Sequence, residues 1–223
     1  MTLFLNTQFL KPLALASLLT LGLAAAQNNM PGMDMSNSST GGTSQGSATG
    51  MNMSSSSMGG MDMTGMQSGL AGLQKLSGKA FDRAFLSMMI PHHQAAVDMS
   101  RAVLPKASDA TVKKWANQII AAQNREISQM NAWLKTLGGT DTAMQGMMKQ
   151  TMSGMGKMVS GAKDPQRAFV QGMLPHHASA IEMASLALRK SSDARVLGLA
   201  RDIVRAQATE MHDFRTWLVK RPG

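Results

Sequence analysis

Two stretches of this chain combine histidine with methionine: MIPHHQAAVDM at residues 89–99 and MLPHHASAIEM at residues 173–183. Four of the five histidines lie in them as two His-His pairs, and the chain has no cysteine. Imidazole with thioether, in the absence of thiolate, is a ligand set that favours copper, especially Cu(I), or silver. Methionine also suits an oxidising compartment, where thiols would be lost to disulfides. The two stretches therefore indicate soft-metal sites.

Helical geometry would bring the candidate ligands of each stretch onto one face. At about 100° per residue, one arc of roughly 120° holds both imidazoles, two methionines and a small alanine. The candidate ligands are Met89, His92, His93 and Met99 in the first copy and Met173, His176, His177 and Met183 in the second. Asp98 and Glu182 fall on the opposite side and should face solvent. Because neighbouring side chains diverge by about 100°, we expect one histidine of each pair to bind metal with methionine and the other to contact a carboxylate.

That carboxylate is expected on a second helix. Residues 108–137 and 192–219 each show an apolar stripe at helical spacing, with Glu126 or Glu210 in its middle. A buried carboxylate is unfavourable unless it is paired or coordinated, and the His-His pairs are the nearest partners. Each glutamate would either fix the tautomer of an imidazole or bind Cu(II) directly.

The two copies form a tandem repeat. His176 and Glu210 follow His92 and Glu126 at the same offset of 84 residues, without a gap. Each copy has the pattern of a helical hairpin, and one hairpin alone would leave an apolar face exposed. We therefore predict an all-α four-helix bundle of two hairpins, at residues 79–138 and 164–223. The Met- and Gly-rich linker 139–163 between them is expected to form a loose amphipathic turn or two.

The N-terminal part has a different composition. Residues 1–26 show a lysine, an apolar run and a small-residue site, which predicts a cleaved secretory signal peptide that is too short to span a membrane. Residues 27–78 are rich in Ser, Gly and Met and are expected to be disordered. Their methionine clusters exceed what a linker needs and would capture Cu(I) loosely. We therefore expect an exported protein of the periplasm, the cell envelope or the extracellular space, without a membrane span after cleavage.

The net charge of +9 is spread over helix flanks. There is no basic run with interleaved aromatic residues, so the charge indicates a basic surface rather than binding to nucleic acid.

The repeated pattern resembles the family called domain of unknown function 305. The shared features are F-x3-M-[IL]-P-H-H-x2-A-[IV]-[DE]-M, then I-x2-A-Q-x2-E and W-L, over residues 85–99 with 119–134 and 169–183 with 203–218. The resemblance implies a fold similar to ferritin-like four-helix bundles, as in exported CopM-like proteins that bind copper and help cells tolerate it. It also implies metal contacts by the eight His and Met residues named above. Met130 is a further candidate ligand, but Phe214 replaces the corresponding methionine in the second copy.

The leading hypothesis is a non-enzymatic copper-binding protein that sequesters or carries the ion outside the cytoplasm. A transporter or chaperone that exchanges metal with it cannot be named from the sequence. One alternative is a ferritin-like di-metal oxidase or peroxidase, although such bundles use Glu-x-x-His pairs, and here Gln129 and Asp213 stand three residues after the glutamates. Another is a helical adaptor that binds no metal, in which histidine and methionine only fill the core.

Overall fold

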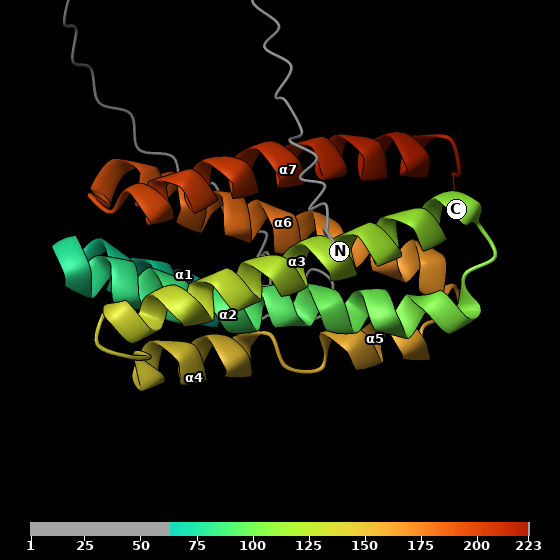
Figure 1. Ribbon diagram of the computed structural model, residues 1–223. Helices are drawn as coiled ribbons and strands as arrows, with labels where there is room; N and C mark the ends of the chain where they lie inside the picture. Colours follow the sequence, from blue (N-terminus) through green and yellow to red (C-terminus); the bar gives the residue numbers. More distant parts are fainter. Residues whose placement is uncertain (1–62, 223) are drawn as a thin grey trace, which may run out of the picture. The chain divides into compact units, whose positions relative to one another are not determined.

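The computed structural model describes residues 63–222, and within that range the chain is helical without a strand (Figure 1). The helices are α1 (Met63–Gln74), α2 (Gly78–Val103), the short 3₁₀ helix η2 (Leu104–Lys106), α3 (Ala110–Thr136), α4 (Thr142–Thr151), α5 (Met155–Gly161), α6 (Pro165–Lys190) and α7 (Ala194–Val219). The predicted all-α class is confirmed. The predictions for the signal peptide, residues 1–26, and for the methionine clusters up to residue 62 lie outside the described residues.

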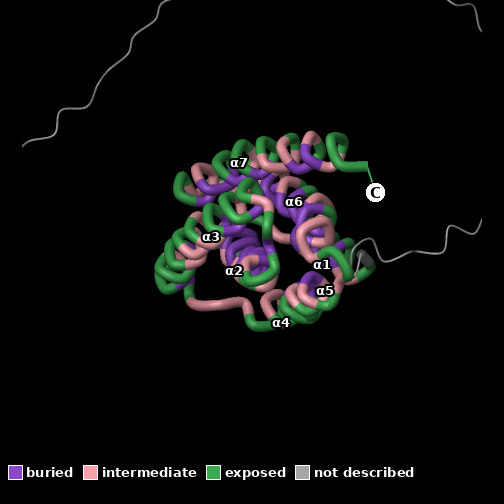
Figure 2. The backbone as a smooth tube through the Cα atoms, turned by 90° about the vertical axis from the view of Figure 1, so that its right-hand side faces the viewer, coloured by how far each residue is buried: buried purple, intermediate pink, exposed green. Residues whose placement is uncertain are grey.

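The four long helices form two hairpins, α2 with α3 and α6 with α7, which pack together through α2 and α6. The second hairpin repeats the first at the offset of 84 residues, as predicted. Viewed end-on, the buried residues of α2 and α6 face the centre of the bundle, while much of α3 and α7 is exposed (Figure 2). α2 and α6 therefore position whatever lies in the core.

Aspartate side chains begin four of the helices. Asp109, Asp141, Asp164 and Asp193 each accept a hydrogen bond from a backbone N–H in the first turn of α3, α4, α6 and α7. Such N-caps satisfy donors that have no partner within the helix and place negative charge at its positive end. Asp109 and Asp193 stand at equivalent positions of the two repeats, so α3 and α7 begin in the same way.

The N-terminal helix α1 differs from the expectation of disorder up to residue 78. Met66 and Leu73 of α1 are buried against the bundle, and Leu70 packs beside them. The backbone carbonyl of Gln74 also accepts a hydrogen bond from the Lys190 side chain of α6. Composition alone predicted disorder because it does not count apolar area that a neighbouring helix buries.

The linker 139–163 is also more ordered than expected. It forms α4 and α5, which lie along α2 (Figure 1), and Met148, Met152 and Met155 are buried there. Gly154 separates the two helices with a φ of 83°, a conformation that favours glycine. The methionines give the segment an apolar face, and packing on α2 and α6 supplies the burial that holds it in place.

Candidate metal centre

The four paired histidines form one continuous group across the core, which we call the imidazole row: His93, His92, His176 and His177. The ring centroids of His92 and His176 are 3.9 Å apart, although the two residues belong to different hairpins. Within each pair the centroids lie 6.2 Å apart in the first copy and 5.9 Å apart in the second. All four side chains are fully buried. The two sites expected from the sequence are therefore joined at the contact between α2 and α6.

A glutamate lies at each end of the row. His93 Nε2 is 2.7 Å from Glu126 Oε2, and His177 Nε2 is 2.6 Å from Glu210 Oε2. The predicted contact between one histidine of each pair and a carboxylate of the second helix is confirmed. The carboxylates are less buried than predicted, with 22% and 27% of their side chains exposed, because α3 and α7 lie at the outside of the bundle. Each glutamate thus connects a buried imidazole to solvent.

The two central histidines have partners that the sequence analysis missed. His92 Nε2 is 2.9 Å from Ser179 Oγ, and His176 Nε2 is 2.9 Å from the backbone oxygen of His92. Ser179 Oγ in turn donates to the backbone oxygen of His176, 2.7 Å away. In the first repeat the position equivalent to Ser179 is occupied by Ala95. That polar replacement on the histidine face was the signal that could have identified the residue.

These partners define where the hydrogens of the row lie. The Ser179 hydroxyl donates its hydrogen to the backbone oxygen of His176. The hydroxyl oxygen therefore accepts a hydrogen bond from His92 Nε2–H. A carbonyl and two carboxylates accept from the other three Nε2 atoms. In a neutral imidazole with hydrogen on Nε2, the other nitrogen, Nδ1, carries a lone pair. All four Nδ1 atoms are buried and have no hydrogen-bond partner.

Burial keeps the central pair neutral. Removal from water, followed by the charge of neighbouring imidazoles, lowers the pKa of both His92 and His176 well below the usual 6.5. Both rings therefore present a basic lone pair rather than a second N–H at neutral pH. Leaving one such acceptor unpaired costs about 1–3 kcal/mol. A cation bound to the lone pairs of the row would remove this cost.

The predicted methionine ligands are fully buried on the same helices as the row. Met89, Met99, Met173 and Met183 have no exposed surface. A Cβ added to Gly172 would lie 3.6 Å from the sulfur of Met99, so this thioether of α2 extends to α6. Asp98 and Glu182 are exposed, as predicted from the opposite face. The four thioethers are thus buried on α2 and α6, the two helices that carry the imidazoles.

The two ends of the row differ in one residue. Phe214 of α7 is buried with its ring centroid 5.5 Å from that of His177. At the equivalent position of α3 stands Met130, which is also fully buried. The position that carries an aromatic ring in the second repeat thus carries a thioether in the first.

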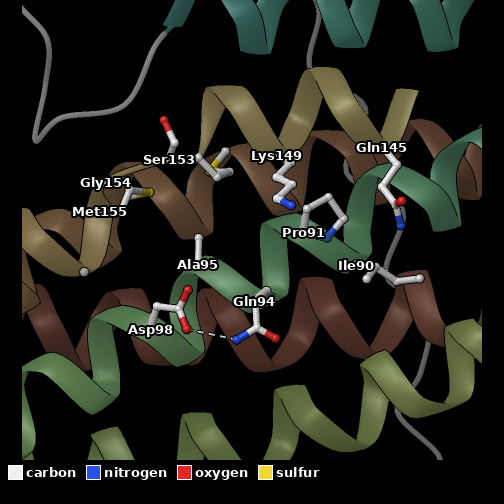
Figure 3. Close-up of a pocket in the computed structure, with 12 residues that line it drawn as sticks. Ile90, Pro91, Gln94, Ala95, Asp98, Gln145, Lys149, Ser153, Gly154 and Met155 are labelled. Carbon is white, nitrogen blue, oxygen red and sulfur yellow. Dashed lines mark hydrogen bonds between the residues drawn. The ribbon is translucent and has the colours of Figure 1, made fainter. Parts of the chain in front are cut away.

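Two openings lie near the row without containing it. A cavity of about 420 Å³ lies on the far face of α2, against α4 and α5, lined by Pro91, Asp98 and Lys149 among others (Figure 3). An open groove of about 840 Å³ runs between α3 and α7 and includes Glu210. The groove gives solvent a path to the carboxylate that contacts His177.

Carboxylates and imidazoles alone do not form a larger cluster. Among residues 63–222, no three His, Asp or Glu side chains are grouped to hold one metal ion.

Over the same range, no helix combines the length and apolar character that a membrane span requires.

The chain belongs to the family defined by the domain of unknown function DUF305, which matches residues 23–134 and 166–222. The two matched segments contain both His-His pairs and both glutamates. The chain is also similar to the uncharacterised protein L153 of Acanthamoeba polyphaga mimivirus, at 40% identity over 53 residues. That match spans 24% of this chain and only 35% of the viral protein.

Solved structures of the family share the fold. CopM in its Cu(I)-bound form is 31% identical, with a TM-score of 0.54 over 64% of this chain and 98% of CopM. CopM in its Cu(II)-bound form gives a TM-score of 0.55 at the same identity, over 63% and 98% of the two chains. A DUF305 protein of Streptomyces coelicolor, named as a secreted protein, is 25% identical, with a TM-score of 0.55 over 63% of this chain and 93% of its own.

Proposed function

We propose that this protein is an exported copper-binding protein that sequesters or carries the ion and does not catalyse a reaction on it. The observation that carries the proposal is the imidazole row, with four buried Nδ1 atoms that lack a partner in a core rich in thioether sulfur. Imidazole with thioether is the ligand set expected for Cu(I). The Cu(I)-, Cu(II)- and Ag-bound structures of CopM support the same metal class.

The geometry suggests how the ligands are held. A metal-binding histidine usually donates its other ring N–H to a carboxylate or a backbone carbonyl, which fixes the ring. His93 and His177 meet this condition through the glutamates, and His176 meets it through the His92 carbonyl. Glu126 and Glu210 would therefore orient the imidazoles rather than bind Cu(I), while Nδ1 and the buried methionine sulfurs provide the ligands.

A titration with Cu(I) under anaerobic conditions, against a competing chromophoric chelator, tests the proposal. His92→Gln and His93→Gln should each weaken the tightest site sharply, because each removes a lone-pair donor. Glu126→Gln should weaken it roughly 10–100-fold, because the ring loses its orienting partner but remains present.

The fifth histidine offers a matched control. The His212 side chain is 78% exposed and lies beside Asp213, away from the buried row, so His212→Gln should bind Cu(I) like the parent. Melting temperatures of all variants separate loss of ligand from loss of fold. If the row variants bind Cu(I) as the parent does and are only less stable, the histidines are core residues and the proposal is wrong.

A further inference from the structure

A group of methionine side chains packs against α1 where this helix meets α2 and α4. We call Met88, Met144 and Met147 the thioether cluster. Met88 of α2 is fully buried, and the two methionines of α4 are half-buried against the core. None of the three belongs to the ligand set of the imidazole row.

Two glycines of α1 bring these side chains together. A Cβ added to Gly69 would lie 2.6 Å from Cε of Met88 and 3.2 Å from Cε of Met147. A Cβ added to Gly72 would lie 3.3 Å from Cε and 3.7 Å from Sδ of Met144. The methyl groups of Met88 and Met147 therefore fill the space beside Gly69, and the end of the Met144 side chain fills the space beside Gly72. Because Gly69 and Gly72 are three residues apart, they share one face of the helix.

The composition of α4 indicates that methionine is present at this junction for its sulfur and not only for its volume. Its sequence, TAMQGMMKQT, contains methionine as the only large apolar residue. Leucine has a similar volume and is at least as good a helix former, and Leu↔Met exchanges in cores usually change stability little. Elsewhere the core of this chain uses leucine, as at Leu86 of α2 and Leu186 of α6. Packing alone would be served equally well by leucine at positions 144 and 147.

The cluster differs from the imidazole row in its access to solvent. Met144 and Met147 keep part of their surface exposed, whereas every imidazole of the row is fully buried. A set of neutral thioethers without imidazole or carboxylate selects soft monovalent ions over Zn(II) or Mg(II). Methionine side chains are unbranched and flexible, so the sulfurs can turn toward one ion without moving the helices.

We propose that the thioether cluster is a second, all-sulfur metal site of this protein, which takes Cu(I) or Ag(I) at the junction of α1, α2 and α4. The site needs none of the histidines and forms independently of the imidazole row. Met66 stands three residues before Gly69 and is buried on the same helix, so its sulfur is a candidate for a fourth ligand.

Silver titration followed by NMR tests this site residue by residue. The chain is labelled with ¹³C at the methionine methyl groups, each signal is assigned by a single Met→Leu substitution, and AgNO₃ is added stepwise. The methyl signals of Met88, Met144 and Met147 should shift together. The double variant Met144→Leu/Met147→Leu should lose one equivalent of Ag(I) in competition with a chelator and keep its melting temperature.

Two further variants separate this site from the row. In His92→Gln/His176→Gln the cluster signals should still shift, even if the histidine-dependent site is lost or never existed. Met211→Leu changes a half-buried methionine of α7 outside both groups, so its Ag(I) stoichiometry should equal that of the parent. If the three cluster signals do not respond to Ag(I), or if the double leucine variant binds as many equivalents as the parent, the cluster is packing and the proposal is overturned.

Discussion

Each imidazole of the row uses Nε2 for a protein partner and leaves Nδ1 buried without one. Half of the ring nitrogens of the row therefore have a hydrogen-bond partner within the protein. At the residue scale, this arrangement makes the row sensitive to protons as well as to metal, because either would compete for the same lone pairs.

Acid should destabilise the metal-free protein through the central pair. Burial lowers the pKa of His92 and His176 in the folded state, while the unfolded chain keeps the ordinary value near 6.5. Below that pH the unfolded state binds protons that the folded state cannot accept, so stability is present above about pH 6.5 and falls as the pH is lowered. The loss should be on the order of 1 kcal/mol per pH unit for each histidine.

Thermal unfolding of the metal-free protein between about pH 7.5 and 5 measures this effect, within the range in which histidine titrates. The variant His92→Gln/His176→Gln is the comparison, because it removes both groups and should show a flatter dependence on pH. A parent protein whose melting temperature is unchanged on acidification, or rises, would contradict the burial of neutral rings.

At the scale of the elements, Asp109 links the ends of two helices that belong to different hairpins. It caps α3 through the N–H groups of Thr111 and Val112, and its other oxygen accepts from Trp217 Nε1 at 3.0 Å and from Arg221 at 2.7 Å. Burial raises the pKa of this carboxyl, but these hydrogen bonds and the Arg221 charge outweigh it, so the pKa lies below its usual value. The carboxylate thus holds the start of α3 against the end of α7.

Asp193 provides the matched comparison for that residue. It stands at the equivalent position of the second repeat and caps α7, but its other side-chain contact is Arg195, two residues away on the same helix. Asp193→Ala should cost about 1 kcal/mol for the lost cap. Asp109→Ala should cost about 1–3 kcal/mol more, because the Trp217 donor also loses its acceptor. Denaturant unfolding of the two variants gives both values, and equal losses would show that the link between the hairpins contributes nothing.

At the scale of the whole molecule, the two hairpins and the inserted helices form one core with the row at its centre. α2 contacts α3, α4, α5 and α6, and α1 closes the side at which the thioether cluster lies. Because α1 belongs to the packed bundle, a test of the N-terminal methionines should remove only the residues that precede it.

Deleting residues 27–62 should lower the number of Cu(I) ions bound and leave the tightest site unchanged. The reason is that the deleted segment carries methionine clusters but none of the buried histidines. Stoichiometry and affinity come from the same anaerobic titration against a chelator. A control variant with the methionines of 30–61 changed to serine keeps the length and should match the deletion; unchanged stoichiometry in both would exclude those methionines as ligands.

Local patterns account for what the sequence by itself determined. The offset of 84 residues and the arc that carries His92 and His93 depend on spacing along a helix, and both are present in the structure. The pairing of each outer histidine with a glutamate also followed, since a buried carboxylate needs a partner and few were available.

Only the tertiary structure decided how the two copies meet. The contact between His92 and His176, and the role of Ser179, depend on how α2 and α6 are rotated against each other, which no periodicity within one helix encodes. Composition likewise did not predict that α1 and α4 form ordered helices. Both helices are short and contain glycine, so burial stabilises them: α1 packs mainly on α4, and α4 packs on α2. That gain exists only once the bundle has formed.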